Sequence, residues 1–177
     1  MKKRYFKLLI TNPRDFIYSV LCSSDKKTKL FEFNPKSLTI AQEIIKKIKS
    51  KINDSIITLV GSAGLQIPGR KEIDIVVETR KSSLKKNIKI LTEIFGAPAK
   101  TRRTFAEWNF KYKGYYVELT LAVFFCKISG RMLYGYRLLK QNPKLRQKYI
   151  ELKRKNKNAP EREYNIIRTE FFDNILK

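Results

Sequence analysis

The sequence contains no histidine and only two cysteines, Cys22 and Cys126. The absence of histidine excludes Ser-His-Asp and Cys-His catalytic sites and most zinc sites. The two cysteines lie far apart in the sequence, so they form neither a disulfide framework nor the closely spaced pair of a metal site. Any chemistry of this chain must therefore use carboxylates, lysines, tyrosines and a bound metal ion.

Long hydrophobic runs are also missing. The longest, over residues 119–126, has the length of a strand and is too short to span a bilayer. The apolar residues near the N-terminus are too few for the hydrophobic region of a signal peptide. We therefore expect a soluble, cytoplasmic protein that does not bind membranes.

Acidic residues are scarce relative to basic ones. The 177 residues include 39 Lys and Arg but only 16 Asp and Glu, which gives a net charge of +23 at pH 7. Such a charge is typical of proteins that bind RNA or another polyanion. A composition biased toward lysine explains it equally well without any such partner, and the sequence alone does not decide between the two. The hydrophobic content of 42% is enough for a folded core.

Hydrophobic periodicity predicts alternating helices and strands in the middle of the chain. Residues 1–29 could form strands or a short helix, and their role is unknown. Thr39 and Gln42 have the spacing of a capping box at the start of an amphipathic helix. The predicted elements are a helix over 39–52, strands over 56–60 and 72–77, a helix over 84–95, and a hairpin of 105–112 with 115–125.

The C-terminal part is predicted to be helical. Asn142 and Pro143 form a helix start, and Pro160 begins another helix. Basic side chains lie between the apolar stripes of these helices and form either a phosphate-binding ridge or an ordinary solvated surface. They are Lys144, Arg146, Lys148, Lys153, Arg154, Lys155 and Lys157.

The segment 57–77 carries the candidate chemistry. A hydrophobic strand leads into Gly61-Ser62, and the next strand presents Glu72 and Asp74. Because side chains alternate along a strand, the two acids share one face, with Cα atoms about 6.5 to 7 Å apart. Carboxylates at this spacing can bind Mg²⁺ or Mn²⁺, while a glycine-containing turn can bind phosphate. The pattern Glu-x-Asp alone is common and does not indicate a metal site. The preceding Gly-Ser, between two apolar strands, makes it indicate one.

A third acid, Glu118, lies within an apolar strand. If this strand lies beside residues 72–77, three carboxylates converge, and Glu118 acts as a metal ligand or base. The alternative is a solvent-facing position on an edge strand. Arg70 and Lys71 precede the acids and either contact phosphates or are ordinary loop charges.

These residues resemble the polymerase-beta-type nucleotidyltransferase superfamily, and within it the GrpB-like (UPF0157) family. The resemblance covers residues 30–177: segments 61–63, 67–69 and 73–75 match the family's core, and segments such as 138–143 match its C-terminal helices. It implies an α+β fold with a mixed β-sheet flanked by helices, with residues 30–128 as the nucleotidyltransferase-like core. Residues 129–177 would be basic helices packed on it. Members of this family often have histidine where this chain has Glu118.

The resemblance implies a metal-dependent nucleotidyltransferase that moves a nucleoside monophosphate from a nucleoside triphosphate to a hydroxyl. Its catalytic and metal-binding residues would be Glu72, Asp74 and Glu118, and its nucleotide-binding residues Gly61, Ser62, Arg70 and Lys71. The acceptor could be a small molecule, a protein or RNA.

A second hypothesis is an inactive module that binds RNA through mixed basic and aromatic residues. These are Lys100, Arg102, Arg103, Phe105, Trp108, Tyr112, Tyr115 and Tyr116. A third is one member of a two-protein system, such as a toxin and antitoxin, in which the transferase modifies an acidic protein partner.

Overall fold

The computed structural model describes residues 26–176, so most of the N-terminal segment 1–29 lies outside the described residues. Residues 31–143 form one compact unit, and the described residues 26–30 and 144–176 belong to a second. Among residues 26–176, no helix has both the length and the apolar character needed to cross a membrane.

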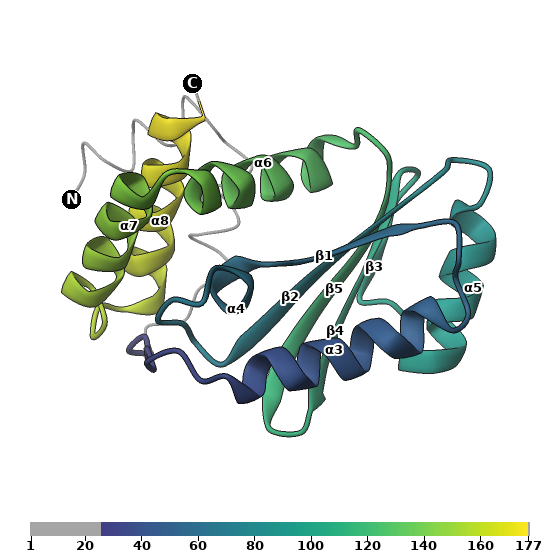
Figure 1. The fold of residues 1–177 in the computed structure, drawn as a ribbon, viewed down its shortest axis with the longest axis horizontal. Coiled ribbons are helices and arrows are strands. Elements are labelled where there is room, and N and C mark those ends of the chain that lie inside the picture. Colours follow the sequence, from purple (N-terminus) through teal and green to yellow (C-terminus); the bar gives the residue numbers. More distant parts are fainter. Residues whose placement is uncertain (1–25, 177) are drawn as a thin grey trace. The chain divides into compact units, whose positions relative to one another are not determined.

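A five-stranded mixed sheet forms the centre of the first unit, in the order β1-β2-β5-β4-β3 (Figure 1). β2 and β5 are parallel, and the other neighbours are antiparallel. This is the mixed α+β sheet flanked by helices that the sequence predicts. The strands are β1 (Ile56–Val60), β2 (Glu72–Thr79), β3 (Lys100–Thr101), β4 (Phe105–Tyr112) and β5 (Tyr115–Val123).

Two helices, α3 (Lys36–Lys49) and α5 (Leu84–Phe95), contribute to the main core with one face of the sheet. Alternate residues of β2 and β5 point into this core and are fully buried. They meet the apolar stripe of α3, formed by Ile40, Ile44 and Ile48. Burial of these side chains on one face leaves the acids of β2 on the other face.

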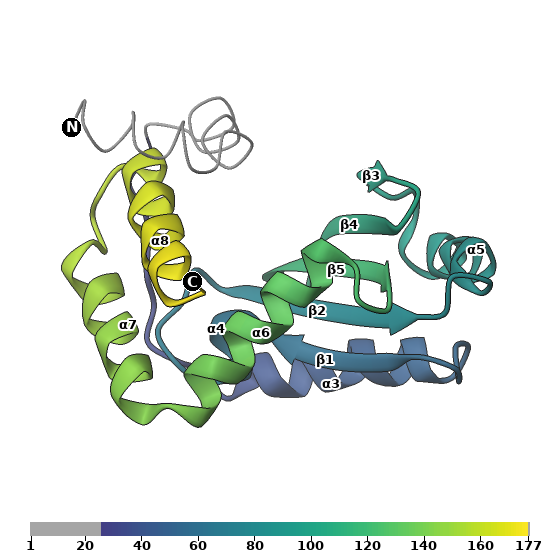
Figure 2. The ribbon, with the colours of Figure 1, turned by 90° about the horizontal axis from the view of Figure 1, so that it is seen from above.

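Helix α6 (Lys127–Gln141) packs on the opposite face of the sheet (Figures 1 and 2). Leu133 of α6 packs against Val60 and Val76. Near the end of β2, the Ser129 hydroxyl donates a hydrogen bond to Glu78 at 3.4 Å. Helix α6 therefore covers the Val76–Glu78 end of the face that also carries Glu72 and Asp74.

Helix α3 begins three residues before the predicted start, so the capping box of Thr39 and Gln42 is wrong. Asn34 performs the capping role instead: its side-chain oxygen accepts the Lys36 amide at 2.9 Å, and its carbonyl accepts the Ser37 amide at 2.9 Å. Pro35 has a helical φ of −54° and extends the helix backward.

The other predicted elements of this unit are confirmed within a few residues. Helix α5 has the predicted bounds, between Ser83 and Gly96, and β4 and β5 form a hairpin through Lys113 and Gly114, both with positive φ. The periodicity analysis missed the two-residue strand β3 and the full helix α6. Helix α6 contains two glycines, Gly130 and Gly135, which lower its helix propensity.

The second unit contains α7 (Pro143–Lys155) and α8 (Glu161–Ile175), which begin as predicted after Asn142 and at Pro160. The Tyr149 ring of α7 stacks on Phe171 of α8, with centroids 5.0 Å apart. Lys153 was predicted to belong to the basic ridge, but it is buried, and its Nζ lies 5.3 Å from the centre of the Tyr149 ring. The predicted basic ridge therefore does not include Lys153.

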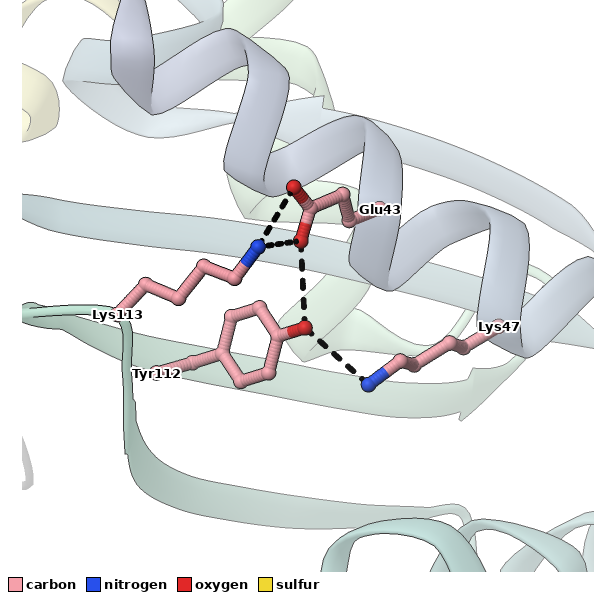
Figure 3. Close-up of polar contacts among 4 residues, drawn as sticks. All are labelled: Glu43, Lys47, Tyr112 and Lys113. Atoms are coloured by element: carbon pink, nitrogen blue, oxygen red, sulfur yellow. Dashed lines mark hydrogen bonds and ion pairs between the residues drawn. The ribbon is translucent and has the colours of Figure 1, made fainter.

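A polar network joins α3 to the β4–β5 hairpin (Figure 3). The Lys113 ammonium donates to both oxygens of Glu43, at 2.9 and 2.7 Å. The Tyr112 hydroxyl donates to Glu43 at 3.2 Å, and Lys47 donates to the Tyr112 hydroxyl at 3.2 Å. Lys113 has φ +48°, so the turn conformation brings its side chain to the helix.

This network makes stability depend on pH. The hydrogen bond from Lys113 is the main cause that lowers the pKa of Glu43 below its ordinary value of 4.5, and the same contact raises the pKa of Lys113 above 10.5. A carboxyl group whose pKa is lower in the folded protein than in the unfolded protein stabilises the fold at pH values above its unfolded-state pKa. This stability is lost as the pH falls through the folded-state pKa. We expect Glu43→Gln to lower Tm by about 1–3 °C at pH 7, because exposed ion pairs contribute little.

Thermal denaturation of the wild type and Glu43→Gln from pH 3 to pH 8 measures this effect. The difference in Tm should shrink as the pH falls below about 4.5. Glu93→Gln, an exposed acid on α5, is the matched control and should behave like the wild type. A difference for Glu43→Gln that stays constant down to pH 3 contradicts the prediction.

Candidate functional site

The Asp74 carboxylate lies against the backbone of Gly61, at the point where β1 ends. Val60 and Asp74 are paired across β1 and β2, and Gly61 begins the short helix α4 (Gly61–Leu65). A Cβ atom placed on Gly61 would lie 1.8 Å from Oδ2 of Asp74, and Gly61 has φ +61°. A side chain at this position would strain the backbone and would displace the Asp74 carboxylate.

Glu72, Asp74 and Glu118 lie on the same face of the sheet, as alternation predicts. Asp74 pairs directly with Glu118 across the parallel strands β2 and β5, and Glu72 is two residues before Asp74. Paired residues of neighbouring strands lie about 4.8 Å apart and point to the same side. All three acids are half-buried, and β5 is an inner strand, so the alternative of an edge-strand position for Glu118 is wrong.

The three acids lie on one face of the sheet, but their side chains do not surround a common point. Among residues 26–176, no three His, Cys, Asp or Glu side chains are placed close enough to hold a metal ion. Instead, the Arg70 guanidinium forms an ion pair with Glu72, with Nε 3.1 Å from Oε1. Arg70 thus neutralises one of the acids.

Ser62, in the first turn of α4, lies against the loop that leads into β2. A Cβ atom placed on Gly69 would lie 2.7 Å from the Ser62 Cβ and 3.1 Å from its Oγ. Gly69 in turn forms backbone hydrogen bonds with Phe31 in both directions, at 2.8 and 2.9 Å. The loop before β2 is therefore held between Ser62 and the segment at Phe31.

Lys71 lies in this loop and adopts the left-handed conformation, with φ +58°. Its ammonium lies over the Phe31 ring, 4.5 Å from the centroid. Its carbonyl accepts the backbone N–H of Tyr116 at 3.1 Å. Lys71 therefore links the Phe31 segment to the start of β5, beside Glu72.

Tyr116 belongs to the same face as the acids, because it pairs with Glu72 and precedes Glu118 by two residues. Partial burial raises the pKa of its hydroxyl above 10.0, and the charges of Glu118 and Glu72 raise this pKa further. The Tyr116 hydroxyl therefore stays protonated at neutral pH and can donate a hydrogen bond.

The structure separates the aromatic residues of the RNA-binding hypothesis. Phe105, Trp108 and Tyr115 are buried in the core, and Tyr112 is held in the network of Figure 3. Tyr116 alone of this predicted set has an exposed ring. The cations Lys100, Arg102 and Arg103 are exposed, and the Lys100 ammonium lies 5.4 Å from the centre of the Phe105 ring.

Phe31 is the residue at this site that the sequence analysis missed. Its contacts with Gly69 and Lys71 join segments that lie far apart in the chain. Phe31 lies in the short run Leu30-Phe31-Glu32-Phe33, which is too short to carry a periodic signal that would indicate such a contact.

The fold matches that of a solved structure, the conserved protein GrpB from Enterococcus faecalis. The match covers 84% of this chain and 99% of that chain, with a TM-score of 0.61 and 14% sequence identity. The chain has a GrpB-like fold. No protein-family model matches the sequence. No curated protein matches it either. The resemblance predicted from the sequence is therefore confirmed at the level of the fold.

Proposed function

We propose that the protein is a metal-dependent nucleotidyltransferase that moves a nucleoside monophosphate from a nucleoside triphosphate to a hydroxyl acceptor. The observation that supports this most is the position of Asp74. Its carboxylate lies against the glycine that begins α4, and Glu118 is its direct neighbour on the adjacent strand. A phosphate at the Gly61-Ser62 turn would thus lie beside two carboxylates.

The donor set fits Mg²⁺ or Mn²⁺, because these hard cations prefer carboxylate oxygens and complete their coordination with water and substrate phosphates. Glu72, Asp74 and Glu118 would hold the cation. When bound, it supplies charge neutralisation for the phosphates. Phosphate oxygens of the triphosphate would complete the ligand set of this cation.

The chain's own residues would orient the triphosphate and the acceptor. The Gly61 and Ser62 amides and the Ser62 hydroxyl would contact phosphate oxygens, and the cations of Arg70 and Lys71 would offset their charge. The acceptor oxygen attacks the α-phosphorus, the bond to the bridging oxygen breaks, and pyrophosphate leaves. Glu118 would accept the acceptor's proton or bind the cation.

The experiment is a transfer assay with the full chain, each labelled nucleoside triphosphate, Mg²⁺ or Mn²⁺, and total RNA or cell extract as a source of acceptors. We expect label to appear on an acceptor with at least one triphosphate, and a chelator should abolish the transfer. Transfer that persists in the chelator contradicts metal dependence. No transfer with any triphosphate and either metal contradicts the enzyme proposal.

The second candidate, an inactive module that binds RNA or another polyanion, is supported by the net charge of +23 and the exposed cations of α5 and α7. It predicts RNA binding that weakens steeply with salt and does not depend on Mg²⁺. Glu72→Gln separates the two proposals, because it should impair transfer and leave salt-dependent RNA binding unchanged.

A further inference from the structure

Two exposed aromatic residues lie beside Lys71, next to the acids of β2: the Phe31 ring contacts the lysine ammonium, and the Tyr116 backbone contacts the lysine carbonyl. Among the described residues only a few large hydrophobic side chains are exposed, and two of them are Phe31 and Tyr116, each with 41% of its surface accessible. Both side chains are therefore exposed apolar surface that a ligand at this place would cover.

Hydrogen bonds fix the backbone of both residues. Phe31 exchanges two hydrogen bonds with Gly69, and the Tyr116 amide donates to Lys71 while its Cα pairs with Glu72. An aromatic ring on such a fixed backbone loses little conformational freedom when a ligand covers it. These contacts are therefore typical of a preformed binding surface.

The rings are continuous with the proposed phosphate and metal site. Gly69, which holds Phe31, lies against the Ser62 side chain, while Tyr116 lies beside Glu72. Arg70 and Lys71 bring two cations to the loop between them. A ligand that matches this surface has a flat ring at one end and several negative charges at the other. A nucleoside triphosphate has both.

We propose that Phe31 and Tyr116 form the subsite that takes the base of the donor nucleotide, by stacking. This inference rests on the proposed function, because it assigns the base to the same site that holds the triphosphate. The two rings would contact the flat face of the base, and such stacking accepts any base because every base has a flat aromatic face. The subsite therefore favours purines over pyrimidines by ring area and does not select one base strictly.

The test compares ATP with inorganic tripolyphosphate, which carries the charges without the base. Calorimetric titration with Mg²⁺ should show that ATP binds the wild type more tightly. Phe31→Ala and Tyr116→Ala should each weaken ATP binding roughly 5- to 100-fold, the range expected for one stacked base. Tyr116→Ala should leave tripolyphosphate binding unchanged, and Phe31→Ala, which also removes the ring under the Lys71 ammonium, should weaken ATP binding more than tripolyphosphate binding.

Matched variants separate stacking from other effects. Phe31→Trp and Tyr116→Phe keep an aromatic ring and should retain ATP binding, whereas Phe31→Leu keeps only the apolar volume and should lose it. Phe125→Ala removes a ring that is 98% exposed in another loop and should have no effect. The Tm of each variant confirms that it is folded.

The outcomes distinguish this inference from the proposed function. If ATP and tripolyphosphate bind equally, or if the preference for ATP survives both alanine variants, the aromatic subsite is wrong and the phosphate site stands. If neither ligand binds the wild type, the proposed function fails, and the subsite fails with it.

Discussion

Gly61→Ala should reduce nucleotide transfer at least about 100-fold while the protein still folds. The new methyl group would lie 1.8 Å from Oδ2 and 2.7 Å from Cγ of Asp74, so the carboxylate must move away from the start of α4. The φ of +61° adds a backbone penalty, and we expect a loss of about 1–3 kcal/mol in the free energy of unfolding. The transfer assay and urea denaturation measure the two effects.

Gly114→Ala is the matched control for the backbone penalty. Gly114 has φ +81° in the β4–β5 turn, and an added Cβ would meet no atom within 4 Å. This variant should lose about 1 kcal/mol of stability and keep its transfer activity. Equal transfer by the Gly61→Ala protein and the wild type would show that the chemistry does not use the Asp74 position.

A double-mutant cycle isolates the contact between Gly61 and Asp74. Asp74→Ala removes the two nearest atoms that the new methyl group would meet. The stability cost of Gly61→Ala should therefore be smaller in the Asp74→Ala background, with a coupling of about 0.5–3 kcal/mol. Additive costs would mean that the two residues do not contact each other in solution.

Asp74→Asn should reduce transfer by about three orders of magnitude or more, because a cation ligand contributes several kcal/mol to the transition state. The amide has nearly the same shape as the carboxylate, so the fold should survive. Glu78→Gln is the matched control: it lies on the same strand and face, about 13 Å away, and keeps its acceptor for the Ser129 hydroxyl. Transfer by Asp74→Asn within about tenfold of the wild type would exclude a direct role for this carboxylate.

The local features of the fold could be predicted from the sequence. Alternation along β2 and β5 places Glu72, Asp74 and Glu118 on one face, and this follows from the strand period alone. The limits of α5 follow from Ser83 and Gly96. Helix α3 shows the limit of such rules, because Asn34 and Pro35 begin the helix before the residues that match the capping pattern.

The contacts that join distant segments could not be predicted. The register that pairs Asp74 with Glu118 depends on a parallel pairing of strands separated by a helix and two other strands. The ion pair of Arg70 with Glu72 forms across Lys71, whose left-handed backbone no sequence rule indicates for lysine. The position of Phe31 beside this loop likewise depends on the tertiary fold.

The central claim is that the carboxylates on this face bind a divalent cation together with a triphosphate. Titration of Mn²⁺ followed by electron paramagnetic resonance, in the presence of a triphosphate with a non-hydrolysable α–β bridge, measures this directly. The wild type should bind Mn²⁺, and Asp74→Asn should bind it at least about tenfold more weakly. Equal Mn²⁺ binding by the two proteins, or no binding by the wild type, would contradict the account.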